Sequence, residues 1–272
     1  MKKFSAAVTF VMVWGIVLFC LFSTSVYAFE DTTIHIGNQA QSLKDALEMI
    51  PAHAGDVKIV IDYDYTENCR FKEDGWQAKF EIPEDRGITS VTITGNGRRR
   101  TIKSNSSIKP VLVTNGVPLT IDYGIDMEAS QFILVGGSYA GYDHPHRSVD
   151  ESSLTVNGAV LWIYGGGFSG VNGSTSEVDQ VNVTLNGYAE RVYSGGRVNA
   201  GETYVHSAKL TFGNESQLGY GICFGGFTVN VNQPSAVVDQ TDIYWNAGGN
   251  NVPVITDSTY CNMVEAASPS LH

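Results

Sequence analysis

The sequence predicts an all-β protein built as a single parallel β-helix of about seven coils, closed at its N-terminal end by one helix. Three observations lead to this fold class. Glycine pairs recur at a fixed spacing, a second set of apolar residues recurs with nearly the same period, and one amphipathic segment precedes both. A fixed period of about 29 to 30 residues is typical of solenoids, in which each repeat contacts only its neighbours.

The first repeat consists of glycine pairs that each follow a short apolar segment. The pairs begin 30, 29 and 30 residues apart, at Gly136-Gly137, Gly166-Gly167, Gly195-Gly196 and Gly225-Gly226. When the segments are aligned on these glycines, four branched residues fall in one column, at Ile133, Ile163, Val192 and Ile222. Strands stacked at about 4.8 Å form ladders of like residues. We therefore expect this column to face the core, with Ile163 between Ile133 and Val192.

The second repeat lies between the glycine pairs and begins with a valine. The valine recurs after 29, 27 and 33 residues, at Val149, Val178, Val205 and Val238. Apolar residues follow it at +5 and +7 in segments rich in Val, Ile, Thr and Tyr, as in β-strands. The period is shorter than the ~40–50 residues of a propeller blade. Strands near residues 59, 91, 119, 154, 183, 210 and 243 give about seven coils.

A short amphipathic segment precedes the repeats. Its apolar residues follow helical spacing, at Leu43, Ala46, Leu47 and Ile50. This spacing predicts a helix over 42–50 that Pro51 ends and that covers the bare end of the first coil. The expected organisation is a signal peptide at 1–28, a cap at 29–56, a β-helix at 57–249 and a C-terminal tail or cap at 250–272.

Residues 1–28 have the three parts of a secretory signal peptide. Lys2 and Lys3 give a positive start, an apolar run covers 6–22, and Val26-x-Ala28 fits the cleavage pattern. An uncleaved N-terminal anchor is the alternative, because the apolar run is long for a signal peptide. We expect a secreted protein, extracellular or at the cell surface, with no membrane span after cleavage.

The charge balance argues against a nucleic-acid partner. The chain has 17 basic and 28 acidic residues and a net charge of −11, whereas nucleic-acid binding needs a basic face. After the leader is removed, three cysteines remain, Cys69, Cys223 and Cys261. They lack zinc or redox spacing. Their disulfide status stays open, with Cys223 expected as a buried thiol and a Cys69–Cys261 bridge as an alternative.

The order of these elements resembles the right-handed parallel β-helix of the pectin-lyase-like superfamily. The resemblance rests on "SLKDALEMI", "VKIVIDYDY", "VTITGNGRRRTI" and the "LTVNG … IYGGG" coils, and it covers about residues 32–249. It implies a right-handed coil, with a left-handed β-helix as the alternative. The catalytic motifs of the superfamily's polygalacturonases, pectin methylesterases and pectate lyases are missing from this chain. The glycine-pair coils look more like those of adhesin-like bacterial secreted or surface proteins, so the sequence leans away from an enzyme.

A loop between coils carries the most reactive-looking residues. The step from Leu119 to Leu154 is about six residues longer than the next one, so we expect residues 139–151 to project from the solenoid. The candidate catalytic residues are Asp143, His144, His146 and Arg147. Histidine and carboxylates at this spacing suit a metal or an acid–base pair. The alternative is a solvated loop whose bend Pro145 fixes.

A column of acidic residues forms the candidate metal site. Asp150, Asp179 and Asp239 follow the recurring valine, with His206 at the equivalent place in the third repeat. Stacked carboxylates repel one another unless a cation neutralises them. Calcium, which takes several oxygen ligands, would suit the column. The alternative is that each carboxylate caps the backbone of its own turn.

Aromatic and basic residues form the candidate carbohydrate site. If Ile163 and Val192 face the core, their neighbours face outward, at Trp162, Tyr164, Arg191 and Tyr193. Aromatic faces stack on sugar rings while polar neighbours supply hydrogen bonds. The alternatives are that a loop covers this face or that the aromatics lie inside.

Two smaller candidates complete the set. Asp62 and Asp64 face one way on a strand, as an acid–base pair of a glycosidase would, although adjacent solvent-exposed acids are common. The run 98–100 is the single cluster of three consecutive arginines. It is either a solvated turn or a contact for an acidic sugar.

The function that the sequence favours is non-catalytic binding of a polysaccharide or surface glycan by a monomeric, adhesin-like protein. One alternative is a polysaccharide lyase or glycoside hydrolase with its site at residues 143–147. Another is a structural spacer of a surface adhesin. No cofactor is expected beyond calcium.

Overall fold

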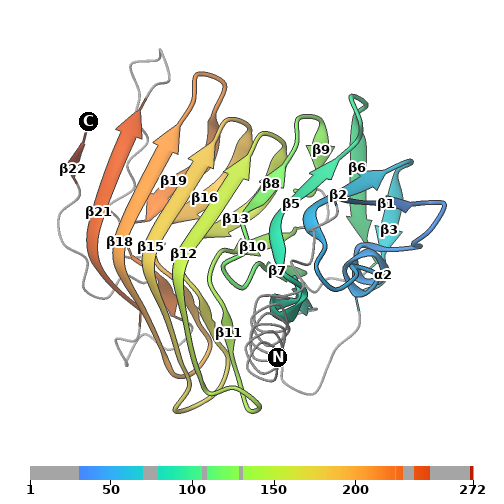
Figure 1. Ribbon diagram of the computed structural model, residues 1–272. Coiled ribbons are helices and arrows are strands. Elements are labelled where there is room, and N and C mark those ends of the chain that lie inside the picture. Colours follow the sequence, from blue (N-terminus) through green and yellow to red (C-terminus); the bar gives the residue numbers. More distant parts are fainter. Residues whose placement is uncertain are drawn as a thin grey trace, which may run out of the picture.

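The protein is a right-handed parallel β-solenoid of about seven turns, which confirms the expected fold class (Figure 1). The computed structural model describes residues 31–69, 79–105, 109–128, 131–223, 225–228, 236–245 and 270–271. Every strand pair within these ranges is parallel. The leader at 1–28 and most of the predicted tail at 250–272 lie outside the described residues.

The first sheet runs the length of the solenoid, and its arrows lie side by side in Figure 1. Its nine strands, in spatial order, are β1 (Thr32–Ile36), β2 (Gly55–Ile61), β5 (Ile88–Thr94), β8 (Leu119–Ile121), β12 (His146–Val156), β15 (Thr175–Leu185), β18 (Glu202–Phe212), β21 (Ala236–Trp245) and β22 (Ser270–Leu271). The later strands, from β12 onward, are longer than the early ones. Their C-terminal halves continue the early strands, and their N-terminal halves are additional. They carry the acidic column.

The second sheet forms the opposite wall of each turn. Its strands are β3 (Tyr65–Glu67), β4 (Lys79–Glu81), β6 (Arg100–Ser104), β7 (Val111–Val113), β9 (Ile125–Asp126), β10 (Ile133–Val135), β13 (Ala159–Tyr164), β16 (Tyr188–Tyr193) and β19 (Gln217–Cys223). Strand β13 pairs with both β9 and β10. In the early turns this wall therefore consists of two short strands, and a single strand takes their place from β13 onward.

A third, short sheet follows each glycine corner. It contains β11 (Tyr139–Ala140), β14 (Phe168–Ser169), β17 (Arg197–Val198) and β20 (Phe227–Thr228), in that order. The glycines are needed because the turns approach closely there. A Cβ atom on Gly166 would lie 2.7 Å from the backbone nitrogen of Gly196 and 2.7 Å from a methyl of Val205.

The predicted helix is present as α2 (Leu43–Glu48), but it is shorter than the predicted range 42–50. Ser42 caps its N-terminus by accepting a hydrogen bond from the backbone N–H of Asp45, at 3.0 Å. Leu43, Ala46 and Leu47 are buried on its inner face. A short 3₁₀ helix, η1 (Glu84–Arg86), follows β4. Within the described residues, no helix is long and apolar enough to cross a membrane.

The valine repeat has the expected register. Val149, Val178, Val205 and Val238 are successive partners across the first sheet. The apolar residues at +5 align in the same way, at Leu154, Val183, Leu210 and Ile243. Local alternation sets this register because a slip by one residue would turn the whole apolar set toward water.

The glycine repeat is shifted by one residue at its first step. Leu134, and not Ile133, pairs with Ile163, and Gly137 donates its backbone N–H to Gly166, at 3.0 Å. The three consecutive glycines at 165–167 make two alignments equally good by sequence. Since strand side chains alternate between faces, the shift places Leu134 in the inner column and Ile133 on the outer face. Ile163 is buried as predicted, but between Leu134 and Val192.

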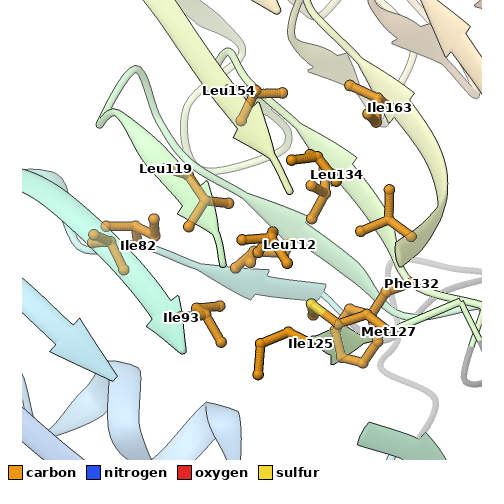
Figure 2. Close-up of a cluster of buried hydrophobic side chains, with 14 of the residues drawn as sticks. Ile82, Ile93, Leu112, Leu119, Ile125, Met127, Phe132, Leu134, Leu154 and Ile163 are labelled. Carbon is orange, nitrogen blue, oxygen red and sulfur yellow. The ribbon is translucent and has the colours of Figure 1, made fainter. Parts of the chain in front are cut away.

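The main core fills the space between the first two sheets. Figure 2 shows Ile93, Leu119 and Leu154 of the first sheet facing Leu112, Leu134 and Ile163 of the second, and all six are buried. A second apolar cluster lies on the other face of the second sheet. Its buried members are Val111, Val113, Ile133, Val135, Leu161, Tyr164, Phe168, Tyr193 and Cys223. Both faces of this sheet are therefore apolar in the later turns.

The cysteines differ from the expectation. Cys69 is a buried free thiol, so the Cys69–Cys261 bridge is not formed. Burial raises the pKa of this thiol, which makes it a weak nucleophile. Cys223 is disulfide-bonded and not a buried thiol. Its partner is not among the described residues.

Candidate functional site

A small polar pocket lies where the loop between β11 and β12 meets strand β4. Its volume is about 150 Å³. Three of the four candidate catalytic residues line it, namely Asp143, His144 and Arg147. Lys79, Glu81, Asn115, Tyr139 and Tyr142 also contribute to the lining. His146 is not part of this lining. It begins β12, where it pairs with Thr175.

The projecting loop is shorter than predicted. Strand β11 holds residues 139 and 140, and β12 begins at residue 146, so the loop is only 141–145. The remaining extra residues lengthen β12, because they find a parallel partner along the whole of β15. Asp150 therefore belongs to a strand and not to a loop.

Ion pairs fix the walls of the pocket. The ammonium of Lys79 lies 2.7 Å from a carboxylate oxygen of Glu81 and 3.5 Å from the centre of the Tyr139 ring. Arg147 pairs with Glu84 of η1. Tyr142, in contrast, is 80% exposed. One free aromatic ring thus stands beside charged groups that are already positioned by their neighbours.

The four candidate carbohydrate residues come together on the outer face of the second sheet, but two of them are covered. Tyr164 and Tyr193 are fully buried in the second apolar cluster, so the prediction that they form an exposed stripe is wrong. Phe168 and Phe227 of the third sheet turn back beside them after the glycine corner.

Trp162 and Arg191 are half-buried, and two cationic groups already lie close to the indole ring. The Lys109 ammonium lies 3.7 Å from the centre of the Trp162 ring, and the Arg191 guanidinium lies 5.6 Å from it. The indole N–H donates to Glu190, at 3.3 Å. Burial lowers the pKa of Lys109. The nearby Arg197 and Arg191 lower this pKa further, whereas Glu190 raises it. This cluster is a structural cation–π network with one exposed ring at its edge, Tyr220.

The residues of the acidic column align in register, but they lie along strands and not at corners. Asp150, Asp179, His206 and Asp239 each follow a valine of the aligned set. The alternation breaks there, because the next residue is also on the solvent side. His206 lies between two acids, with Nδ1 2.9 Å from Asp239 and Nε2 2.7 Å from Glu177.

Both hydrogen bonds favour the charged form of His206. An imidazole donates from both nitrogens only when it is protonated, so its pKa is raised, first by Asp239 and then by Glu177. The sequence pattern did not indicate Glu177 as a member of this group. The available signal was its place two residues before Asp179, on the same face of the strand and one coil from the histidine.

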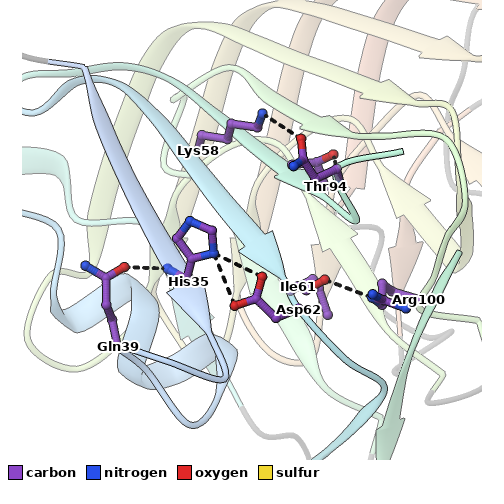
Figure 3. Close-up of polar contacts among 8 residues, drawn as sticks. His35, Gln39, Lys58, Ile61, Asp62, Thr94 and Arg100 are labelled. Carbon is purple, nitrogen blue, oxygen red and sulfur yellow. Dashed lines mark hydrogen bonds and ion pairs between the residues drawn. The ribbon is translucent and has the colours of Figure 1, made fainter. Parts of the chain in front are cut away.

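Asp62 and Asp64 do not act as a pair. Figure 3 shows the Asp62 carboxylate bound to Nδ1 of His35, at 3.0 Å and 3.1 Å. Asp64 instead accepts the backbone N–H of Thr101, at 3.0 Å. Each carboxylate has its own structural partner, so the glycosidase interpretation is not supported.

The arginine run lies at a corner between the first two sheets. Arg100 donates to the backbone carbonyl of Ile61, at 3.0 Å (Figure 3). Arg99 and Arg100 line an open groove of about 380 Å³ together with the exposed Tyr123. Arg100 is therefore a structural clamp between turns, while Arg99 faces solvent.

Comparisons with models of known protein families, with curated proteins and with solved structures give no significant match to this chain. The fold assignment therefore rests on strand order and register alone.

Proposed function

We propose that this protein is exported and binds a polysaccharide or surface glycan without chemical turnover. The observation that carries the proposal is the polar pocket at the β11–β12 loop, where the exposed ring of Tyr142 stands beside Lys79, Asp143 and His144. A sugar offers an apolar C–H face and a rim of hydroxyls, which match an aromatic ring and fixed polar groups.

The size of the pocket points to a subsite for part of a chain. Its volume of about 150 Å³ is below the ~300–1,000 Å³ of sites for drug-sized ligands. One ring of a glycan fits such a pocket, and the rest of the chain would lie on the neighbouring surface. The parallel solenoid supports this interpretation because it provides a rigid, elongated surface.

An enzyme that cleaves the glycan is the second candidate. The specific observation in its favour is that two carboxylates, Glu81 and Asp143, share the pocket with His144. Such groups can act as acid and base in hydrolysis or elimination. The binding proposal is preferred because the chain lacks the catalytic motifs of the enzymes it resembles.

A panel of immobilised and soluble polysaccharides tests both candidates. Retention without product release supports binding, and product release that Asp143→Asn abolishes supports the enzyme. Tyr142→Ala should weaken binding about tenfold, as expected for a stacking contact of ~1–2 kcal/mol. Tyr142→Phe should bind like wild type, and Tyr63→Ala serves as a control at an exposed tyrosine outside the pocket. Absence of both retention and products would contradict the proposal and favour a structural spacer.

A further inference from the structure

Three side chains with metal-binding atoms converge on the exposed face of the long strands. Glu177 and Asp179 lie two residues apart on β15, and His206 lies on the adjacent strand β18. Their ligand atoms all lie within 4.8 Å of one another. His206 Nε2 is 2.7 Å from Glu177 Oε1 and 3.9 Å from Asp179 Oδ1. Zinc–ligand bonds of about 2.0–2.2 Å place tetrahedral donors about 3.3–3.6 Å apart. Small rotations of these three side chains would therefore bring their donor atoms to the spacing that a zinc ion requires.

A fourth residue orients the histidine for this task. Asp239 of β21 accepts from Nδ1 of His206, at 2.9 Å, which leaves Nε2 directed at Glu177 and Asp179. Histidines that bind metals almost always donate their other ring N–H to a carboxylate or carbonyl in this way. The cluster thus combines a nitrogen donor, two oxygen donors and an orienting carboxylate on three paired strands.

The same sheet contains a histidine that lacks these features. His35 also binds a carboxylate through Nδ1, that of Asp62 at 3.0 Å. Within the described ranges, however, the group of three potential ligands forms at His206 and not at His35. The side chains of His35 and His206 are 39% and 48% exposed, and both residues belong to the first sheet. They therefore form a matched pair for experiment.

We propose that Glu177, Asp179 and His206 bind a divalent transition-metal ion, with Zn²⁺ as its probe. The imidazole nitrogen selects this class, because calcium takes oxygen ligands whereas zinc accepts nitrogen and oxygen. Because a histidine stands among the ligands, the ion expected at this column is zinc and not the calcium that the carboxylates alone suggested. Three protein ligands leave one position of a tetrahedral ion open to water or to an oxygen of another molecule.

Calorimetric titration of the metal-stripped full chain with Zn²⁺, at one mildly alkaline pH, tests the site. Wild type should bind one ion, and His206→Ala should lose at least 100-fold in affinity. Asp239→Ala should weaken binding about 10–100-fold, because the orienting hydrogen bond is lost. His35→Ala should bind like wild type. Each variant changes an exposed side chain, and its melting curve verifies that it is folded.

Two results would contradict the proposed metal site. One is that His206→Ala binds Zn²⁺ as tightly as wild type. The other is a loss in His35→Ala as large as that in His206→Ala, since this would indicate diffuse binding to an acidic surface. The visible spectrum of the Co²⁺-loaded chain provides a second readout. Nitrogen and oxygen ligation is expected, whereas a thiolate charge-transfer band would assign the metal to a cysteine and contradict the proposal.

Discussion

Tyr164 of β13 and Tyr193 of β16 stack on neighbouring turns, with ring centroids 4.4 Å apart and ring planes 16° apart. The separation is close to the ~4.7–4.9 Å between paired strands, so the register of the solenoid alone brings the rings into contact. Arg191 lies 3.5 Å from the Tyr193 hydroxyl. Within the described ranges, the buried hydroxyl of Tyr164 makes no hydrogen bond of standard geometry, and its polar neighbour is the Tyr193 hydroxyl, which contributes to its raised pKa.

Tyr164 should therefore contribute through its ring and not through its hydroxyl. Tyr164→Ala leaves a cavity in the second cluster and should lower the free energy of unfolding by ~3–5 kcal/mol. Tyr164→Phe removes an unsatisfied buried hydroxyl and should raise it by about 1 kcal/mol. Urea denaturation measures both variants. A large loss in Tyr164→Phe would show that the hydroxyl has a partner.

Ile163 should be indispensable for the inner ladder. Ile163→Asp places an unpaired charge between Leu134 and Val192, which should cost several kcal/mol and prevent folding. Gln217→Asp, at an exposed position of the same sheet, should fold normally. Circular dichroism and the yield of soluble protein provide the measurement. A melting temperature like that of wild type in Ile163→Asp would refute the inside–outside assignment.

Gly166 should tolerate no side chain. Its Cβ would meet backbone atoms of the next turn, which cannot rotate away, so Gly166→Ala should cost about 3 kcal/mol. Gly173→Ala is the control, because no atom lies within 4 Å of a Cβ there and only its φ of +77° opposes the change. That substitution should cost about 1 kcal/mol. Equal melting temperatures of the two variants would contradict the close approach of the turns.

Glu67 should make stability depend on pH. Its carboxylate is 2% exposed and accepts hydrogen bonds from the backbone of Leu43 and from the Tyr65 hydroxyl, at 2.9 Å and 3.1 Å. Burial raises its pKa. The folded state thus holds the proton of Glu67 more tightly than the unfolded state does. The resulting stabilisation is complete below the pKa of the unfolded state, about 4.3. It is lost as the pH rises through the higher pKa of the folded state.

Glu67→Gln keeps the oxygen acceptor and removes this titration. The variant should match wild type near pH 4 and become the more stable of the two as the pH rises toward 7. Melting temperatures across that range measure the difference. The exposed Glu48→Gln should change little at any pH. A variant that falls further below wild type as pH rises would mean that the buried group is held as the carboxylate.

Export should remove the first 28 residues. The positive start, the apolar run and the Val26-x-Ala28 pattern predict a mature N-terminus at Phe29. Intact-mass measurement of the protein recovered outside the cytoplasm tests this directly. A product that retains Met1–Ala28 would support the anchor and contradict the secreted form.

The sequence by itself determined the solenoid, the valine register and the capping helix. These features depend on the local alternation of apolar and polar residues and on a repeated period, so the same pattern occurs in each successive coil. Val149 and Val178 align because any slip would expose their strands' apolar sides. Leu43 and Leu47 face inward because helical spacing puts them on one stripe.

Only the tertiary structure decided which face of the second sheet is covered and which acids gather around His206. The three glycines at 165–167 allowed two alignments, and hydrogen bonding between turns selected one of them. Tyr164 is buried because the chain turns back after the glycine corner, which no local pattern encodes. Glu177 reaches His206 across a coil boundary. Contacts of this kind join residues about 30 positions apart, and their geometry follows from the path of the chain between them.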